Sequence, residues 1–262
     1  MADERRWTVV TGASSGIGAE LARAFAARGS SLVLVARRRE RMEALAAELH
    51  KDRDIAIEIM ALDLEDPAAP AALIRALDGL GIVTHTLVNN AGFGLRGRFA
   101  DLPYDEQIGM VELNVVALTK LCRMALPGLI ERRRGGILNV ASTAAFQAGP
   151  NMAVYYATKA FVLSLSEALH EEAKPHGVTV TALCPGPVPT EFQARAGMDT
   201  ARLMKLDFMA LSAAEVAQAG VEGYEAGKAI VIPGVANRFG AWGAQRIAPR
   251  ALARRLAGKL QA

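Results

Sequence analysis

Three side chains near the middle of the chain have the types and the spacing needed to exchange a proton with a carbonyl oxygen. They are Ser142, Tyr155 and Lys159. Because the tyrosine and the lysine lie four positions apart, a helix would place both on one face. A nearby ammonium favours the phenolate and lowers the tyrosine pKa from about 10, which would make the phenol a usable acid and base. A serine hydroxyl facing the same oxygen would stabilise the charge that develops there.

The sequence around this trio predicts the elements that would position it. Apolar residues recur at helical spacing over residues 154–169, and Pro150 suits the first turn of such a helix. Ser142 follows the apolar run 136–140, which is typical of a buried strand. A tyrosine and a lysine four residues apart also occur by chance on surface helices, so the interpretation depends on the rest of the chain.

A glycine-rich turn near the N-terminus predicts a dinucleotide site. Residues 11–18 read TGASSGIG and lie between an apolar run and a helical pattern. Gly12 suits a tight turn, Gly16 the approach of a pyrophosphate, and Gly18 close packing of helix on strand. The phosphates would bind at the positive N-terminus of the helix. The spacing differs from the usual G-x-G-x-x-G, and a flexible surface turn is the alternative.

The end of the second predicted strand indicates which dinucleotide would bind. An NAD site usually has an acidic residue here, about 20 residues after the central glycine. This chain instead has Ala36, followed by Arg37, Arg38 and Arg39. A guanidinium suits the 2′-phosphate of NADP through charge-assisted hydrogen bonds. Arg37 is the main candidate, whereas Arg39, and to a lesser extent Arg38, would also suit the solvated start of the next helix.

Polar turns follow the third and fourth predicted strands. Asp63 and Leu64 form an acid-bearing turn that could contact adenine. Residues 89–92, NNAG, are small and amide residues that suit close contact with a cofactor. Asn114 lies inside the long helical pattern over residues 103–134, where asparagine is poorly suited. An exposed amide is the alternative explanation for it.

The composition limits the possible classes of protein. The chain has 262 residues, of which 52% are hydrophobic and 5% aromatic, and its net charge is +3. These values are typical of one globular domain and exclude a disordered chain. Cys122 and Cys184 match no disulfide framework, and the four histidines match no metal spacing, which favours a reducing cytoplasm and no bound metal. No signal peptide and no membrane span is expected.

Together, the motifs resemble those of the short-chain dehydrogenase/reductase family. The matching features are TGASSGIG at 11–18, NNAG at 89–92, Asn114, Ser142, Tyr155 with Lys159, and PGPV at 185–188. They extend from residue 11 to residue 190, and the separation of the serine from the tyrosine is the one usual in that family. The resemblance implies an α/β fold: a doubly wound parallel sheet of about seven strands with helices on both faces, in one Rossmann-like domain over residues 1–262.

The resemblance also implies roles for individual residues. Tyr155 would be the general acid and base, Lys159 would lower its pKa and hold the nicotinamide ribose, and Ser142 would polarise the carbonyl. Asn114 would anchor a water in a proton relay, and Thr190 would touch the nicotinamide carboxamide. The residues implied for cofactor binding are Gly12, Ser14, Ser15, Gly16, Ile17, Gly18, Arg37, Arg38, Asp63, Leu64, Asn90, Ala91, Gly92, Tyr155, Lys159, Pro185, Gly186, Val188 and Thr190.

The function expected from these features is NADPH-dependent reduction of a small carbonyl compound, by a homodimer or homotetramer. A catalytically silent NADP-binding regulatory protein on the same fold is the alternative. The basic run 132–134 and the basic tail suggest a third possibility, a protein that binds nucleic acid or a membrane surface. This is not favoured, because basic clusters this short are more often solvated surface.

Two further segments are predicted from their apolar patterns. The Met- and Leu-rich segment 191–212 predicts a substrate lid for apolar ketones or aldehydes, with an ordinary packed helix pair as the alternative. Residues 237–262 predict an amphipathic basic helix. That helix would pack on a subunit, cover the substrate cleft or lie on an anionic membrane.

Overall fold

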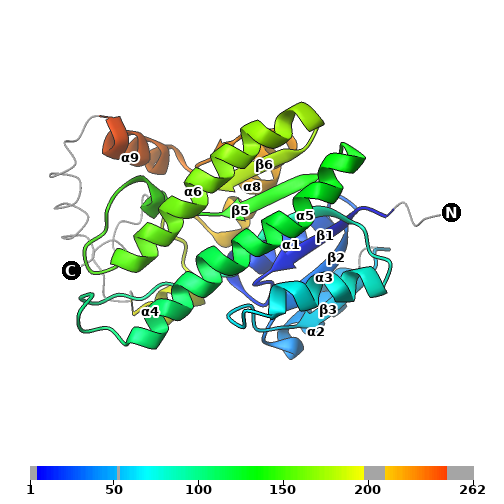
Figure 1. The fold of residues 1–262 in the computed structure, drawn as a ribbon, viewed down its shortest axis with the longest axis horizontal. Helices are drawn as coiled ribbons and strands as arrows, with labels where there is room; N and C mark the ends of the chain where they lie inside the picture. Colours follow the sequence, from blue (N-terminus) through cyan, green and yellow to red (C-terminus); the bar gives the residue numbers. More distant parts are fainter. Residues whose placement is uncertain (1–4, 52–53, 198–209, 247–262) are drawn as a thin grey trace.

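The computed structural model describes residues 5–51, 54–197 and 210–246 (Figure 1). Within these residues, runs of branched and aliphatic residues form a sheet of seven parallel strands. The strands are β1 (Trp7–Thr11), β2 (Ser31–Ala36), β3 (Ile57–Ala61), β4 (Thr84–Asn89), β5 (Gly136–Val140), β6 (Thr179–Leu183) and β7 (Ile230–Val231). Their order across the sheet is β3-β2-β1-β4-β5-β6-β7. The prediction of a doubly wound α/β fold is therefore confirmed.

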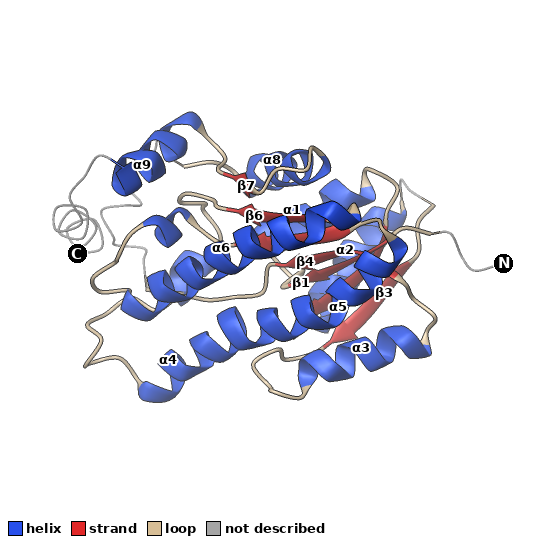
Figure 2. Cartoon of the chain, turned by 45° about the horizontal axis from the view of Figure 1, so that its top comes forward, coloured by secondary structure: helices blue, strands red, loops and turns tan. Residues whose placement is uncertain are grey.

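Helices cover both faces of this sheet, as Figure 2 shows. The α-helices are α1 (Gly16–Ala26), α2 (Arg39–His50), α3 (Ala69–Gly79), α4 (Tyr104–Val111), α5 (Leu118–Arg132), α6 (Ala153–Ala173), α7 (Glu191–Arg195), α8 (Ala213–Glu225) and α9 (Val235–Arg246). Leu121 of α5 and Val162 of α6 are buried in one core, which also includes α3. Leu21 of α1 and Val216 of α8 are buried in a second core with α2. The sheet lies between these two cores.

The strand sequences are apolar throughout because both faces of the sheet are covered. In β1, Val9 belongs to the core beside α5 and α6, and Val10 belongs to the core beside α1 and α8. The strand order reverses at β1: β2 and β3 lie on one side of it, and β4 to β7 lie on the other. Ligands of such sheets bind at the carboxyl ends of the strands beside that reversal. The glycine-rich turn after β1 and the NNAG turn after β4 both lie there.

One long helix runs from Tyr104 to Arg132 through α4, the π-helical segment η1 (Glu112–Ala117) and α5. It has 29 residues, and its most apolar window has a mean hydropathy of 1.4, so by length and composition alone it could cross a membrane. One such helix does not contradict the expectation of no membrane span, because the core helix of a globular protein has the same length and composition. In the fold, Leu121 and Leu129 of this helix are buried in the core, which accounts for part of its apolar character.

The start of α6 differs from the prediction. The helix begins at Ala153, so Pro150 lies in the turn before it and not in its first helical turn. Asn151 has a φ of 66°, in the left-handed region. A residue in that conformation cannot continue a right-handed helix, and it separates Pro150 from α6.

The predicted lid (191–212) and tail (237–262) are described only in part. Residues 198–209 and 247–262 lie outside the described residues. The described part of the lid includes α7 and the start of the turn that leads to α8. The described part of the tail belongs to α9, where Asn237 and Ala241 are buried.

Candidate functional site

The turn after β1 is held directly against the turn after β4. Thr11 Oγ1 accepts hydrogen bonds from the backbone N–H groups of Asn90 and Ala91, both at 3.0 Å. Asn90 Nδ2 donates to the carbonyls of Thr11 and Gly12 at 2.9 and 3.2 Å. The approach is so close that a Cβ on Gly18 would lie 2.2 Å from the Gly12 oxygen. Gly12 itself has a φ of 66°, so both positions require glycine for physical reasons.

A cavity of about 910 Å³ opens beside these two turns. All residues predicted to bind the cofactor line it, from Gly12 in the turn after β1 to Thr190 at the start of α7. Ser142 lines it as well, whereas Asn114 does not. The structure therefore brings together, in one cavity, residues that are up to 178 positions apart in the sequence.

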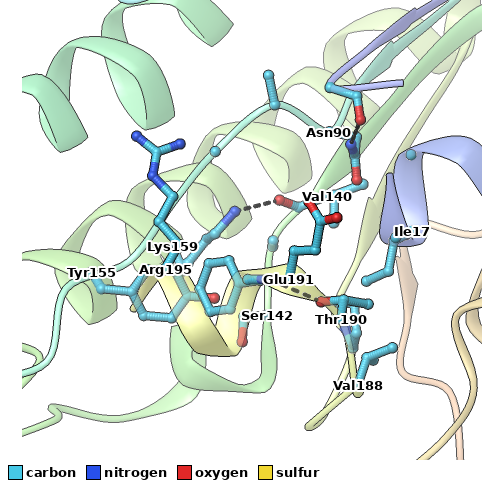
Figure 3. A pocket seen from close by; sticks show the side chains of 18 of the residues that line it. Ile17, Asn90, Val140, Ser142, Tyr155, Lys159, Val188, Thr190, Glu191 and Arg195 are labelled. Atoms are coloured by element: carbon cyan, nitrogen blue, oxygen red, sulfur yellow. Dashed lines mark hydrogen bonds between the residues drawn. The ribbon is translucent and has the colours of Figure 1, made fainter. Parts of the chain in front are cut away.

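Ser142, Tyr155 and Lys159 lie together at one end of this cavity (Figure 3). Lys159 Nζ donates to the carbonyl of Val140 at 2.8 Å and lies 5.9 Å from the centre of the Tyr155 ring. Ser142 Oγ accepts the backbone N–H of Ala144 at 3.1 Å, so its own hydroxyl hydrogen remains available for another partner. Tyr155 and Lys159 are both buried. The predicted trio is thus one compact group, with Ser142 in the turn after β5 and Tyr155 and Lys159 on α6.

Burial has the largest effect on the pKa values of Tyr155 and Lys159. It raises the pKa of Tyr155 above its ordinary value, and a hydrogen bond with Ser142 opposes this shift. It lowers the pKa of Lys159 to about 8. The structure therefore differs from the expectation that the lysine lowers the tyrosine pKa, because removal from water has the larger effect on each group. At neutral pH the phenol is protonated and can donate.

Asn114 lies behind the cavity wall. Its side chain is buried, so the alternative of an exposed amide is wrong. Its Nδ2 donates to the Phe93 carbonyl at 2.9 Å and to Thr158 Oγ1 at 3.1 Å, and its Oδ1 accepts the Phe93 N–H at 3.1 Å. Thr158 in turn donates to the carbonyl of Tyr155 at 2.8 Å. Asn114 therefore ties the turn after β4 to the first turn of α6, and its place in a water relay stays a prediction.

Arg37 already has acidic partners at the edge of the cavity. Its Nη1 lies 3.3 Å from Glu65 and 3.6 Å from Asp63. Glu65 also accepts from Arg195 of α7 at 3.3 Å, and the Arg195 guanidinium stacks 4.0 Å from the centre of the Phe93 ring. The turn after β3, which was predicted to contact adenine, is thus part of an ion-pair network that reaches α7.

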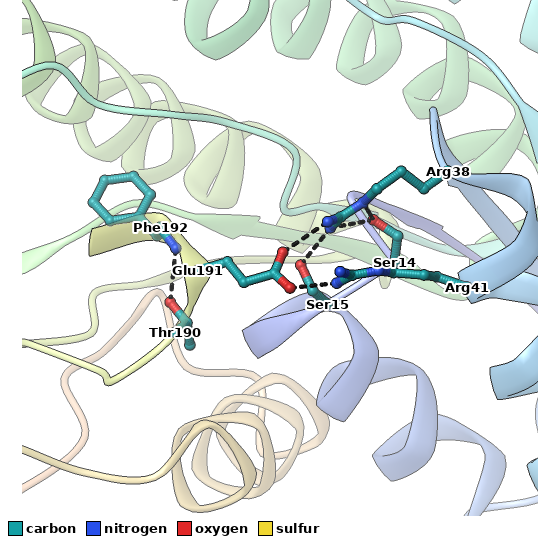
Figure 4. A network of polar contacts seen from close by, with 7 residues as sticks. All are labelled: Ser14, Ser15, Arg38, Arg41, Thr190, Glu191 and Phe192. Atoms are coloured by element: carbon teal, nitrogen blue, oxygen red, sulfur yellow. Dashed lines mark hydrogen bonds and ion pairs between the residues drawn. The ribbon is translucent and has the colours of Figure 1, made fainter. Parts of the chain in front are cut away.

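Arg38 lies directly over the glycine-rich turn. Its Nη2 donates to Ser14 Oγ at 3.0 Å and to Ser15 Oγ at 2.9 Å (Figure 4). Its Nη1 donates to Glu191 of α7 at 2.7 Å. Arg41, one turn into α2, donates to the other oxygen of the same carboxylate. The sequence favoured Arg37 for the 2′-phosphate. In the structure Arg38 contacts the turn that was predicted to hold the pyrophosphate, and the choice between the two arginines for the 2′-phosphate stays a prediction.

An apolar wall completes the cavity beside the trio. Only its Phe192 lies in a segment predicted to meet the substrate, the lid 191–212. Met152, Tyr156 and Phe192 form this wall, and the Phe192 ring lies 5.4 Å from that of Tyr155. The first turns of α9 add Asn237 and other lining residues. Met152 lies immediately before α6 and three residues before Tyr155, so its closeness to the trio in the sequence is a local signal for it. The contribution of α9 arises from chain folding and has no local signal.

Comparison with known proteins gives a consistent assignment. A family model described as short chain dehydrogenase matches residues 6–201. The very-long-chain 3-oxoacyl-CoA reductase of Anas platyrhynchos is 36% identical over 190 residues, which cover 71% of this chain and 60% of that protein. The matched region thus spans about 60% of the length of this curated relative.

Two solved structures are similar over most of their length. A short-chain dehydrogenase from Sphingobium yanoikuyae in complex with NADPH has a TM-score of 0.81 and 37% identity, covering 92% of this chain and 93% of the other. The bulky-bulky ketone specific alcohol dehydrogenase from Comamonas testosteroni has a TM-score of 0.76 and 32% identity, covering 89% of each chain.

Proposed function

The chain belongs to the short-chain dehydrogenase family, and we propose that it uses NADPH to reduce apolar ketones or aldehydes. One observation carries this proposal: Ser142, Tyr155 and Lys159 lie beside an apolar wall, in the same cavity as the glycine-rich turn and Arg38. A proton donor and a dinucleotide site within one cavity are the two parts that carbonyl reduction requires.

The residues around the cavity fit NADP(H) on chemical grounds. The N-terminus of α1 lines the cavity, where its backbone N–H groups suit a pyrophosphate. Ser14, Ser15 and Arg38 offer hydroxyl and guanidinium donors at the glycine-rich turn. These groups suit the 2′-phosphate that distinguishes NADP from NAD. The solved relative from Sphingobium yanoikuyae, which is in complex with NADPH, supports the same choice.

The chain's own residues would supply orientation and the proton. When bound, the nicotinamide supplies reducing equivalents as hydride. Tyr155, which burial keeps protonated at neutral pH, donates a proton to the carbonyl oxygen. Ser142 donates a hydrogen bond to the same oxygen, and the charged Lys159 stabilises the phenolate that forms. Asn114 keeps Tyr155 in place through Thr158.

The proposed substrate class follows from the apolar wall. Met152 and Phe192 present flexible or aromatic surface beside Tyr155, and such side chains adapt to bulky apolar groups. The names of two relatives, a very-long-chain 3-oxoacyl-CoA reductase and a bulky-bulky ketone specific alcohol dehydrogenase, support the same class. We therefore propose bulky ketones, including 3-oxoacyl thioesters, as the compounds to test first.

A second copy of the chain is the proposed partner. Ile108, Met124 and Phe161 are exposed apolar residues on α4, α5 and α6, with exposed fractions of 42%, 40% and 40%. A dimer or tetramer would bury them. Light scattering coupled to size exclusion would measure the mass, and a monomer at micromolar concentration would contradict this part.

The proposed reaction is tested by a panel of carbonyl compounds, with NADPH oxidation as the readout. We expect bulky apolar ketones and 3-oxoacyl thioesters to be reduced faster than short keto acids or sugar phosphates, and NADH to be used less well than NADPH. Faster reduction of a sugar phosphate than of every apolar ketone would contradict the substrate class. Preference for NADH would contradict the cofactor assignment.

A further inference from the structure

Glu191, the first residue of α7, connects the two ends of the cavity. Its carboxylate accepts from Arg38 at 2.7 Å and from Arg41, and Arg38 also contacts Ser14 and Ser15 of the glycine-rich turn (Figure 4). Glu191 is more than 150 positions from Ser15 in the sequence, and both residues line the same cavity. A carboxylate from α7 therefore lies where we propose that the 2′-phosphate binds.

Arg38 and Arg41 depend on Glu191 for charge compensation in a way that their neighbours do not. Arg37 pairs with Glu65 and Asp63, and Arg39 lies 3.7 Å from Glu43. Neither arginine pairs with an acidic residue of α7, although Glu65 also accepts from Arg195 of that helix. Arg38 and Arg41 instead share one carboxylate, and each donates to a different oxygen of it.

Glu191 is an anion at neutral pH. The guanidinium groups of Arg41 and Arg38 hold the pKa of its carboxyl at about 2, well below its usual range, because both donate to it. Its single negative charge faces two positive ones. A phosphate monoester carries about −2 at neutral pH and has three acceptor oxygens, so it would satisfy both guanidinium groups more fully.

From these contacts we propose that Glu191 is an internal competitor of the cofactor's 2′-phosphate for Arg38 and Arg41. It thereby sets how strongly the protein prefers NADPH over NADH. Binding of a 2′-phosphate displaces the carboxylate from the two arginines, whereas a cofactor with a free 2′-hydroxyl leaves the carboxylate in place. Arg41, which no sequence motif marks, becomes a ligand of the phosphate.

The competition reaches the catalytic end of the cavity through α7. Phe192, the next residue after Glu191, packs 5.4 Å from the Tyr155 ring. Thr190, the preceding residue, caps α7 and would lie 3.1 Å from a Cβ on Gly16. Release of Glu191 therefore changes the restraint on a helix that touches both the phosphate turn and the proton donor.

The decisive experiment measures cofactor affinity by calorimetry in Glu191→Gln and in a matched control, Glu43→Gln. Each variant removes one exposed negative charge near α2, but only Glu191 contacts Arg38 and Arg41. The probes are NADPH and 2′,5′-ADP, which carry the 2′-phosphate, and NADH and ADP, which lack it. In Glu191→Gln we expect NADPH and 2′,5′-ADP to bind about threefold to tenfold tighter, with NADH and ADP unchanged within about twofold.

A double-mutant cycle with Arg41→Met sharpens the result. The gain in NADPH affinity from Glu191→Gln should shrink when Arg41 is also replaced, because one of the contested donors is then missing. Equal changes for NADPH and NADH, weaker NADPH binding in Glu191→Gln, or the same gain in Glu43→Gln would each overturn the competition. The inference rests on the proposed function, and binding to the wild-type protein distinguishes failure of one from failure of the other. If the wild type binds neither dinucleotide, the proposed function is wrong. If the wild type binds NADPH but Glu191→Gln does not change the affinity, only the competition is wrong.

Discussion

The two ends of the cavity are built from different kinds of interaction. At the phosphate end, Arg37, Arg38 and Glu191 are exposed and pair with one another or with nearby acids. At the catalytic end, Tyr155 and Lys159 are buried, and the lysine donates to a backbone carbonyl. Exposed ion pairs contribute little each and exchange partners readily, whereas buried polar groups are held in one geometry. The fold thus combines exposed, ion-paired residues at the proposed site of cofactor recognition with buried, hydrogen-bonded residues at the proposed site of proton transfer.

The largest expected effect is at the fixed end. Tyr155→Phe removes the proposed proton donor and keeps the ring that packs against Phe192, so turnover should fall by about 10²–10⁴-fold while NADPH affinity changes little. Tyr156→Phe is the matched control, because Tyr156 is also buried and lines the same cavity. Steady-state rates and calorimetry measure the two quantities. If Tyr156→Phe abolished turnover and Tyr155→Phe did not, the assignment of the proton donor would be wrong.

The backbone of the phosphate end is tightly packed, although its charged side chains are exposed. A Cβ on Gly18 would lie 2.2 Å from the Gly12 oxygen and 2.4 Å from Asn90 Nδ2, so Gly18→Ala should destabilise the protein by about 3 kcal/mol. Gly29 has a φ of 75° and open space around it, so Gly29→Ala should cost only about 1 kcal/mol of backbone strain. Urea unfolding measures both values, and a Gly18→Ala variant as stable as Gly29→Ala would disprove the close packing.

The same contrast explains what the sequence could and could not predict. Individual strands and the spacing of the trio were predictable because they follow local rules: uninterrupted apolar strands, a glycine turn, and Tyr155 and Lys159 one helical turn apart. The doubly wound sheet was implied by the family resemblance. The partner of Arg38 was not predictable, since Glu191 is brought to it only by the fold. The larger effect of burial than of the lysine charge on the pKa of Tyr155 was not predictable either, because the spacing of residues in the sequence does not show how deeply a side chain is buried.

Small backbone features also escaped prediction. The left-handed Asn151 delays α6 past Pro150, and the π-helical segment around Asn114 turns that side chain inward to Phe93 and Thr158. Both depend on single residues whose conformations are set by tertiary contacts. Segments of this kind are frequent at functional sites. Helical periodicity alone cannot locate them.

Burial of Lys159 should be visible as a pH dependence of stability. Its pKa falls from an ordinary 10.5 to about 8 on folding, so between these values the unfolded chain binds more protons than the folded one. Stability then rises with pH in that window, by at most about 1.4 kcal/mol per pH unit. Buried Tyr155 and Cys184 have raised pKa values, which act in the opposite direction, so the wild-type curve alone does not isolate the lysine.

The difference between wild type and Lys159→Met isolates that contribution. The test is thermal unfolding of the cofactor-free proteins at pH 7.5 and pH 9.5, which flank the lowered pKa of about 8. We expect the Tm of Lys159→Met relative to that of wild type to be lower at pH 9.5 than at pH 7.5. Lys174→Met, at an exposed position on the surface, is the control and should keep a constant offset. A constant offset in Lys159→Met as well would mean that the amine is not desolvated in the folded protein.

The smallest expected effect belongs to the exposed arginine that the sequence favoured. Arg37 is half exposed and already faces Glu65 and Asp63, so a 2′-phosphate would gain only part of the benefit of its charge. Arg37→Ala should weaken NADPH by about 1 kcal/mol, or roughly fivefold, at the low end for a charge-assisted contact, with NADH affected less. Arg38→Ala should cost more, because Arg38 alone of the two contacts Ser14 and Ser15. Calorimetry of both variants with both cofactors ranks them. A larger loss of NADPH affinity in Arg37→Ala than in Arg38→Ala would identify Arg37 as the main ligand of the 2′-phosphate. Equal losses of affinity for NADPH and NADH in Arg37→Ala would show that Arg37 does not recognise the phosphate.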